Sequence, residues 1–279
     1  MTIESLTAPT EAINIIVQIA LDEDAARHDK TTQLLPEETL VDGAIVARHR
    51  SVVCGIDAVA AAFGNSVRIT SAVRDGEIVA AKSDIAVFSG SARAILPAER
   101  TILNLLGRLS GIATLTRKHV DKLDPKSDTQ ILDTRKTTPG LRLLEKYAVR
   151  CGGGHNHRMT LAEMVFIKDN HIAAARDLKK LIGGRQAKDF LLIEVDSLDR
   201  LREILPFKPN RILLDNLSDA EVAEALKIVG KKKRPEIEVS GGITLDRVTT
   251  LSKLGVDFIS VGALTHSAPA ADFALEIRR

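Results

Sequence analysis

The chain has 279 residues, of which 44% are hydrophobic and 27% are charged, and its formal net charge is only +2. This length and composition are typical of a globular protein with one large core, or with one core and a smaller domain. Aromatic residues make up 3% and tryptophan is absent. Because single-stranded nucleic acid is bound by aromatic platforms in basic grooves, this composition argues against nucleic acid as a partner.

The sequence shows no run that approaches the ~18 apolar residues of a membrane helix. Its opening MTIESLTAPTEAIN lacks the basic and apolar segments of a secretory signal peptide. The two cysteines, Cys54 and Cys151, have neither metal-ligand spacing nor a disulfide-framework pattern. Cys151 is expected to be a small buried apolar residue rather than a nucleophile. We therefore expect a cytoplasmic protein with no membrane partner.

The first hundred residues predict an α+β unit. Residues 11–21 are apolar enough for a helix. The segments GAIVAR, SVVCGIDAV, VRITSAV and EIVA then predict short strands, and AVAAAFG predicts a helix. Apolar residues at helical spacing predict a further helix over 98–113. A domain junction is expected near the start of that helix.

A different rhythm follows, with short apolar segments that each end in polar or glycine residues. They are ILDTRK, MVFIKDN, FLLIEVD, RILLDN, EIEVSGG and DFISVGA. Helix-like stretches over 177–182, 198–204, 220–229 and 245–254 separate most of them. This alternation predicts βαβ units and a parallel sheet. Neither a Rossmann glycine motif nor a P-loop follows any strand, so dinucleotide and P-loop sites are not supported.

The carboxyl ends of these strands carry the residues that suggest function. They are Arg135, Lys136, Lys168, Asp169, Glu194, Asp215, Ser240-Gly241-Gly242 and Gly262. In (β/α) barrels this end carries the active site, and a phosphate often lies at the loops after the last two strands. Glycines there let backbone N–H groups approach a phosphate, although simple turn glycines are the plainer alternative. We predict an α/β barrel with a mouth that is cationic on one side and acidic on the other.

The segment 131–171 is locally cationic. It holds seven Lys or Arg and three His against four acids, which suits a small, strongly anionic ligand. A helix is predicted over 141–150 within it, ended by Gly152 as the C-cap. On that helix, Lys146 and Arg150 are expected to form a solvated or interface face without an assigned function.

These motifs resemble the quinolinate phosphoribosyltransferase family. The matching runs are ERTILNLLGRLSGIAT, DTRKTTPGLRLLEKYAVRCGGGHNHR, IKDNH, IEVD, LLDN, VSGGI and VGALTHS, which together cover most of residues 99–267. The run His28-Asp29-Lys30-Thr31-Thr32 departs from the family, which commonly has Gly-Asp before its TT pair. A molybdenum-transport-associated sister group shares the TRK-type block and the glycine run. The Asn156-His157-Arg158 and Lys168-Asp169-Asn170-His171 runs resemble the quinolinate enzymes instead.

The resemblance implies an N-terminal α/β sandwich over residues 1–103, joined by the C-terminal tail 267–279. An incomplete α/β barrel of fewer than eight strands would occupy residues 104–266. The implied reaction joins quinolinate to 5-phosphoribosyl-1-pyrophosphate with Mg²⁺ as cofactor, and gives nicotinate mononucleotide, pyrophosphate and CO₂ on the route to NAD. The resemblance also implies a homodimer or larger homo-oligomer, in which Arg100 enters the neighbouring site.

The same resemblance assigns the two carboxylates of quinolinate to Arg135 and Arg158, with His157 and Thr134 beside them. Lys136 and Lys168 are expected to act as catalytic point charges on the phosphates or on quinolinate. A surface or ion-pair role is the plain alternative for any single arginine. Lys168 could instead form a Schiff base, as in barrel aldolases, which defines a rival enzyme class.

Three further assignments complete the expected site. Glu194 and Asp215 are expected to bind the ribose hydroxyls and the Mg²⁺, with a helix cap or an ion pair as the alternative. His171 either binds substrate or is a structural histidine that orients Lys168 or Asp169. Backbone donors are expected to hold the 5-phosphate at Ser240, Gly241, Gly242, Gly262, Ala263 and Leu264. A non-catalytic barrel that only binds a phosphometabolite is the second rival.

Overall fold

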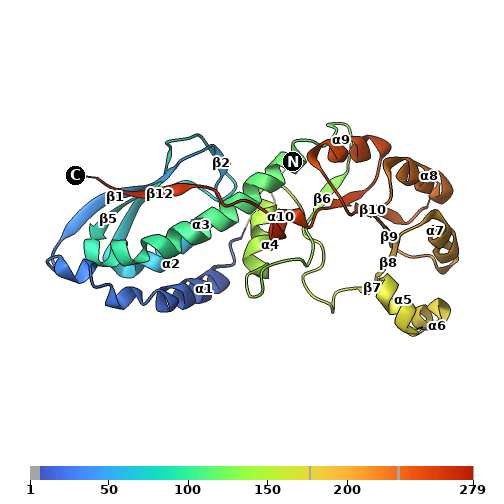
Figure 1. Cartoon of the computed structure of the whole chain (residues 1–279), viewed down its shortest axis with the longest axis horizontal. Helices are drawn as coiled ribbons and strands as arrows, with labels where there is room; N and C mark the ends of the chain where they lie inside the picture. Colours follow the sequence, from blue (N-terminus) through green and yellow to red (C-terminus); the bar gives the residue numbers. More distant parts are fainter. Residues whose placement is uncertain (1–6, 176, 231–232, 279) are drawn as a thin grey trace. The chain divides into compact units, whose positions relative to one another are not determined.

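The computed structural model describes residues 7–175, 177–230 and 233–278, and these divide into two compact units (Figure 1). The first unit takes the described residues up to Arg117, residues 137–154 and those from Ala263 onward. The second takes residues 118–136 and 155–262. The division predicted after residue 103 falls inside one long helix, α3 (Ala92–Val120), and stays a prediction.

An antiparallel sheet of four strands, in the order β12-β1-β5-β3, forms the framework of the first unit. Its strands are β1 (Leu40–Ala47), β3 (Val67–Ala72), β5 (Asp84–Ser91) and β12 (Phe273–Arg278), and a small second sheet pairs β2 (Ser51–Val52) with β4 (Ile78–Val79). The helices are α1 (Thr10–Glu23), α2 (Asp57–Phe63), α3, α4 (Arg142–Cys151) and α10 (Ala263–His266), with 3-10 turns at Ala26–His28, Thr32–Leu34 and Gly64–Ser66. The predicted strand over SVVCGIDAV is wrong beyond Val52, where the chain turns into α2.

The core of this unit lies between the antiparallel sheet and its helices. Ile45 and Phe88 from the sheet, and Ile95 and Ile102 from α3, belong to one cluster of buried apolar side chains. Phe63 of α2 packs edge-on against Phe88, with ring centroids 4.9 Å apart. Burial of this apolar face accounts for the length of α3, which begins earlier and ends later than the sequence predicted.

Lys146 was wrongly placed by the sequence on a solvated or interface face. Its side chain is fully buried, whereas Arg150 is exposed. The reason is that α4 is packed on several sides, since α1 and α10 both contact it. A Cβ on Gly152, at the end of α4, would lie 2.4 Å from the carbonyl oxygen of Ala113 in α3. Helical periodicity cannot reveal an exposed face where a helix has almost none.

A segment before β12 lies directly against α3. The backbone N–H of Ala271 donates to the carbonyl of Gly107 at 2.8 Å. One turn further along α3, a Cβ on Gly111 would lie 2.1 Å from the carbonyl oxygen of Pro269. Because no side chain fits at that distance, Gly111 is required for this close approach.

A parallel sheet of six strands, in the order β6-β11-β10-β9-β8-β7, forms the second unit. The strands are β6 (Gln130–Leu132), β7 (Val165–Ile167), β8 (Leu191–Val195), β9 (Arg211–Asp215), β10 (Glu236–Ser240) and β11 (Phe258–Ser260). The helices are α5 (Asp169–Ala175), α6 (Leu178–Gly183), α7 (Leu198–Ile204), α8 (Asp219–Val229) and α9 (Leu245–Leu254), with a 3-10 turn at Leu205–Phe207. The predicted α/β fold with an incomplete barrel of fewer than eight strands is confirmed.

The strand register separates an apolar face of this sheet from a polar one. Ile193, Ile212 and Ile237 lie side by side on neighbouring strands, and all are fully buried. One residue further along, Glu194 and Glu238 flank Leu213 in the same way. Alternate residues of a strand point to opposite faces of the sheet. Glu194 and Glu238 therefore lie on the face opposite to that of the three isoleucines.

None of the described helices has the length and apolar content of a membrane-spanning segment.

We predict that Gly111→Ala lowers the free energy of unfolding by about 1–3 kcal/mol, the usual cost of overpacking. Gly183→Ala is the matched control, because a Cβ there meets no atom within 4 Å. That variant should be neutral or should gain up to about 1 kcal/mol from the higher helix propensity of alanine. Urea denaturation followed by circular dichroism measures both. Equal stabilities for the two variants would show that α3 does not require this glycine.

Candidate active site

Two arginines lie close together in the second unit. Arg135 follows β6, and its Nε atom is buried without a hydrogen-bond partner among the described residues. Burial lowers the pKa of the Arg158 guanidinium, and the charge of Arg135 lowers it further, with Glu163 acting in the opposite direction. Arg158 is only 8% exposed. Two adjacent guanidinium groups, one with an unused donor, suit a ligand that carries two carboxylates.

Phe166 of β7 is the common contact of three predicted site residues. The Arg158 guanidinium carbon lies 4.9 Å from the centre of its ring, and Lys168 Nζ lies 4.4 Å from it. The His157 ring is stacked on it with a centroid distance of 5.9 Å. An aromatic face attracts cations through its quadrupole, so Phe166 favours the positions of Arg158 and Lys168, while its ring also stacks on His157.

A buried carboxylate, Asp133, fixes the segment that carries His157 and Arg158. Asp133 has no exposed surface. It accepts hydrogen bonds from the Asn156 side chain at 2.5 Å and from the backbone N–H of His157 at 2.9 Å. The segment therefore lies beside β6 in a defined position.

A second buried carboxylate, Glu238 of β10, lies on the other side of His157. Its Oε1 atom is 3.4 Å from His157 Nε2, and it also accepts hydrogen bonds from Ser260 and from Arg211. Burial alone would raise the pKa of Glu238. The contact with His157, the hydrogen bond from Ser260 and the charge of Arg211 together outweigh burial and hold this pKa below its usual value. A lowered pKa favours the carboxylate form of Glu238 beside His157.

Lys168 and Glu194 form an ion pair, with 2.5 Å between Nζ and Oε2. The prediction of a mouth that is cationic on one side and acidic on the other is therefore too simple, because the two kinds of charge meet here. His171 accepts a hydrogen bond at Nδ1 from the backbone N–H of Lys168, at 3.0 Å. This contact favours the structural role of His171 over direct binding of substrate.

A pocket of about 460 Å³ opens beside Glu194 at the strand ends. Its lining comprises Asp169, Ile172, Ala173, Glu194, Asp196, Arg200, Asp215 and Asn216. The acidic side chains offer only hard oxygen donors, which are the ligands Mg²⁺ prefers. They form no cluster of three mutually close ligand atoms in the part of the chain that the structure describes. This donor set fits Mg²⁺, which takes one or two carboxylates and completes its shell with substrate phosphates and water.

The loop after β10 has a backbone that only glycine supports well. Gly241 and Gly242 have φ angles of +88° and +57°. A Cβ on Gly241 would lie 2.1 Å from the side-chain oxygen of Asn216, whose N–H donates to the carbonyl of Ser240 at 2.9 Å. The Arg247 guanidinium joins this loop to the one after β9, since it donates to the carbonyls of Gly241 and Leu217 and pairs with Asp219. Arg247 thus fixes the position of the glycine loop relative to the loop after β9.

The remaining predicted residues fall into two groups. In the second unit, Thr134 accepts a hydrogen bond from the N–H of the exposed Lys136 at 3.1 Å, and Gly262 ends the segment after β11. In the first unit, Arg100 is exposed on α3, and Ala263 begins α10. The Leu264 side chain is fully buried, so only its backbone could serve a ligand. The assignment of all these residues to a site stays a prediction.

Sequence reasoning missed several residues that shape this site: Asp133, Asn156, Phe166, Asn216, Glu238 and Arg247. A signal existed for two of them. Phe166 lies two residues before Lys168 and Glu238 lies two residues before Ser240, so each shares a strand face with a residue that was predicted. Following the two-residue period back from each strand end would have found both.

The open parallel barrel and the cationic cluster at its strand ends define an α/β-barrel protein that binds anionic ligands. Comparison with known proteins is more specific. Residues 29–110 match the family model "Quinolinate phosphoribosyl transferase, N-terminal domain", and residues 112–276 match the corresponding C-terminal domain. The chain belongs to the quinolinate phosphoribosyltransferase family, so the resemblance seen in the sequence motifs is confirmed.

Individual relatives agree over nearly the whole length. A protein of Methanocaldococcus jannaschii named "Probable nicotinate-nucleotide pyrophosphorylase [carboxylating]" is 41% identical, over 95% of this chain and 96% of its own. The solved nicotinate-nucleotide pyrophosphorylase of Francisella tularensis is 37% identical with a TM-score of 0.88, and covers 98% of both chains. The one from Ehrlichia chaffeensis is 36% identical with a TM-score of 0.89, over 98% of this chain and 99% of that one.

We predict that Phe166→Leu weakens the binding of quinolinate about 5- to 30-fold. The leucine keeps an apolar side chain but removes two cation–π contacts, together worth about 1–2 kcal/mol. Isothermal titration calorimetry measures the Kd. The matched control is Phe190→Leu, since Phe190 also lies under an arginine, 5.7 Å from Arg211, but is not a contact of the arginine pair. Equal affinities for Phe166→Leu and wild type would show that the Phe166 ring does not contribute to the binding of quinolinate.

Proposed function

We propose that this chain transfers the phosphoribosyl group of 5-phosphoribosyl-1-pyrophosphate to quinolinate with decarboxylation. The products are nicotinate mononucleotide, pyrophosphate and CO₂, in the biosynthesis of NAD. Family membership and relatives named carboxylating nicotinate-nucleotide pyrophosphorylases support this reaction. The main structural support for the reaction is that Arg135 and Arg158 lie near each other, because two neighbouring guanidinium groups suit a ligand with two carboxylates.

Quinolinate would bind with its carboxylates on the two guanidinium groups. The buried Arg135 Nε supplies a donor that no group in the described part of the chain uses. His157 lies between Phe166 and Glu238, so it can hold the edge of the pyridine ring in place. A ligand held at both carboxylates presents its ring nitrogen in one direction only.

The phosphoribosyl substrate would lie across the acidic pocket and the glycine loop. Glu194 and Asp215 are the residues proposed to hold Mg²⁺, either directly or through water, and the ribose hydroxyls. When bound, Mg²⁺ would neutralise charge on the pyrophosphate. The loop of Ser240, Gly241 and Gly242 would receive the 5-phosphate, continued by the backbone of Gly262, Ala263 and Leu264.

In the proposed reaction the bond from C1 of the ribose to the pyrophosphate oxygen breaks, and the ring nitrogen of quinolinate forms a bond to C1. Lys136 and Lys168 would stabilise the departing negative charge. The resulting pyridinium accepts the electron pair of the C–C bond as the adjacent carboxylate leaves as CO₂. That ring carbon then takes a proton. No general base is required to activate the nitrogen, which attacks with its own lone pair.

The first rival, a Schiff-base aldolase, has less support. Its nucleophile would be Lys168, and that amine lies 2.5 Å from Glu194 and over the ring of Phe166. Formation of a Schiff base would first have to break both contacts. The second rival, a non-catalytic binding barrel, shares the same pocket and is separated only by a test for turnover.

We also propose that the chain acts as a homodimer or larger homo-oligomer, with Arg100 entering the neighbouring site. The exposed position of Arg100 on α3 agrees with this role. Closed two-fold dimers are the commonest form of homo-oligomer. A cytoplasmic location belongs to the same proposal, and the two free cysteines agree with a reducing compartment.

The direct test is incubation of the chain with quinolinate, 5-phosphoribosyl-1-pyrophosphate and Mg²⁺, with chromatography for nicotinate mononucleotide and trapping of CO₂. We expect both products in equal amounts. Thermal stabilisation by the substrates without products would favour the non-catalytic barrel. Consumption of nicotinic acid but not quinolinate would show that quinolinate is not the substrate. The chain would still be a phosphoribosyltransferase in that case.

We predict that Arg135→Ala lowers kcat/KM for quinolinate about 100-fold or more, because loss of a guanidinium–carboxylate pair costs about 3 kcal/mol. KM for quinolinate should rise and kcat should fall. Arg202→Ala is the matched control, since Arg202 pairs with Asp199 on the exposed surface of α7. A folded Arg135→Ala enzyme with wild-type kinetics would exclude Arg135 from the site.

Borohydride trapping with candidate carbonyl substrates tests the aldolase. We expect no covalent adduct on Lys168. A stable adduct on that residue, detected by mass spectrometry, would favour the Schiff-base aldolase over the phosphoribosyltransferase.

A further inference from the structure

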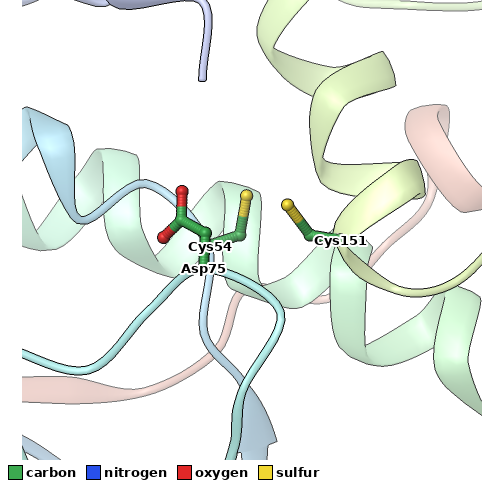
Figure 2. A group of neighbouring side chains, drawn as sticks. All are labelled: Cys54, Asp75 and Cys151. Carbon is green, nitrogen blue, oxygen red and sulfur yellow. The ribbon is translucent and has the colours of Figure 1, made fainter. Parts of the chain in front are cut away.

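The two cysteines of the chain lie close together in the first unit, and neither has a role in the proposed reaction. Cys54 lies between β2 and α2, and Cys151 is the last residue of α4. Both are buried, at 0% and 3% exposure. Figure 2 shows the sulfur atom of Cys54 between the carboxylate of Asp75 on one side and the sulfur atom of Cys151 on the other. The three ligand atoms all lie within 4.8 Å of one another.

We propose that Cys54, Asp75 and Cys151 form a binding site for a zinc-type divalent cation. No part of this proposal depends on the phosphoribosyl transfer.

The dimensions of the cluster fit such an ion. Zn²⁺ binds thiolate sulfur at about 2.3 Å and carboxylate oxygen at about 2.0–2.2 Å, in tetrahedral geometry. Tetrahedral ligands at those lengths stand roughly 3.4–3.8 Å apart. The atoms here, within 4.8 Å of one another, need to draw together by up to about 1.4 Å. Rotation of the cysteine side chains can supply that movement.

The carboxylate of Asp75 has the surroundings of a metal ligand. Its Oδ1 atom accepts hydrogen bonds from the backbone N–H groups of Gly55 and Ile56, at 2.9 and 3.0 Å. Its Oδ2 atom accepts one from the Tyr147 hydroxyl at 2.9 Å. Metal-binding carboxylates are oriented by outer hydrogen bonds of this kind, and Oδ2, which accepts only one of them, still has a lone pair for an ion.

Asp75 also lacks a positive partner. No Lys, Arg or His pairs with it in the residues that the structure describes, and the charge that acts on it comes from another acid, Asp57. A partly buried carboxylate is usually paired with a cation or bound to a metal, so the missing partner is a second sign of a cation here.

The backbone around the thiols is already fixed. Ser110 of α3 accepts a hydrogen bond from the N–H of Cys54 at 2.9 Å and donates one to its carbonyl at 3.2 Å. Tyr147 and Cys151 are four residues apart on α4, so they share one face of that helix. An ion here would join α4 to the loops that carry Cys54 and Asp75.

Binding exchanges protons for the ion. Burial raises the pKa of the Cys54 thiol well above its usual value, and the neighbouring Cys151 raises it further. A thiol ordinarily carries its proton at neutral pH. Formation of two Zn–S bonds would therefore release two H⁺ to solvent. The same effect argues against a redox switch, because a protonated, buried thiol is a poor nucleophile toward peroxides and disulfides.

Co²⁺ provides a specific probe, because thiolate-bound Co²⁺ has a sulfur-to-metal charge-transfer absorption. The chain has only 2 cysteines, so such a band can come from no other residue. The reduced, metal-free full-length chain should bind one Co²⁺, show this band, release two protons and melt at a higher temperature. Zn²⁺ should then abolish the band by displacement.

Variants separate this site from the acidic pocket. Cys54→Ser and Cys151→Ser should each lose most of the band, and Asp75→Asn should keep both thiols but raise the Kd about tenfold or more. Glu194→Gln is the matched control and should leave the band unchanged. Absence of the band in the wild type, or its survival in Cys54→Ser, overturns the proposal. The metal-free chain is also kept in aerated buffer and its mass is measured. A loss of two hydrogens would show that Cys54 and Cys151 form a disulfide, and this would also overturn the proposal.

Discussion

The constraint on which the second unit depends is the repulsion between Arg135 and Arg158. Burial lowers the pKa of the Arg158 guanidinium, and the neighbouring charge of Arg135 lowers it further. Like charges repel more strongly in a partly buried site than in water, so holding the two arginines together costs free energy. The carboxylate of Glu238 beside His157, Asp133 at the start of the loop and the ring of Phe166 all lie next to this cluster and offset part of that cost. A bound dicarboxylate would reduce the repulsion further.

An open barrel makes this arrangement possible. With six strands, the inner face of the sheet can hold polar side chains that reach its mouth instead of the stacked apolar layers that fill an eight-stranded barrel. β10 shows the consequence along one strand. Glu236 pairs with Arg211, Glu238 contacts His157, and Ser240 begins the glycine loop, all on one face. The intervening Ile237 and Val239 are fully buried on the other face. The charged side chains of β10 and the start of the glycine loop therefore lie in a row on the same face of one strand.

The sequence predicted the second unit well because its alternation of strand and helix is strict. Helices predicted over 198–204 and 245–254 have those bounds in the structure, and all six predicted parallel strands are present. Residues at strand ends were found for the same reason, since a polar group after an apolar run is conspicuous. Glu238 and Phe166 were missed because each lies inside a run, where a single acid or ring looks like ordinary strand alternation. In the first unit β5 was missed and SVVCGIDAV was given too long a strand, because short antiparallel strands depend on partners distant in sequence.

The cationic segment 131–171 divides into residues that serve the pocket and residues that hold the fold, and charge alone cannot separate them. Glu145 of α4 is fully buried and accepts hydrogen bonds from the Arg108 side chain at 2.7 Å and from the Thr138 hydroxyl at 2.8 Å. The N–H of Thr138 also donates to Glu145, at 3.1 Å. Thr138 follows Lys136 by two residues, so this network fixes the chain just where it leaves the arginine loop. Buried ion pairs contribute little net stability but penalise other arrangements strongly. Glu145 thus has a structural role within a segment that its cations alone would suggest is functional throughout.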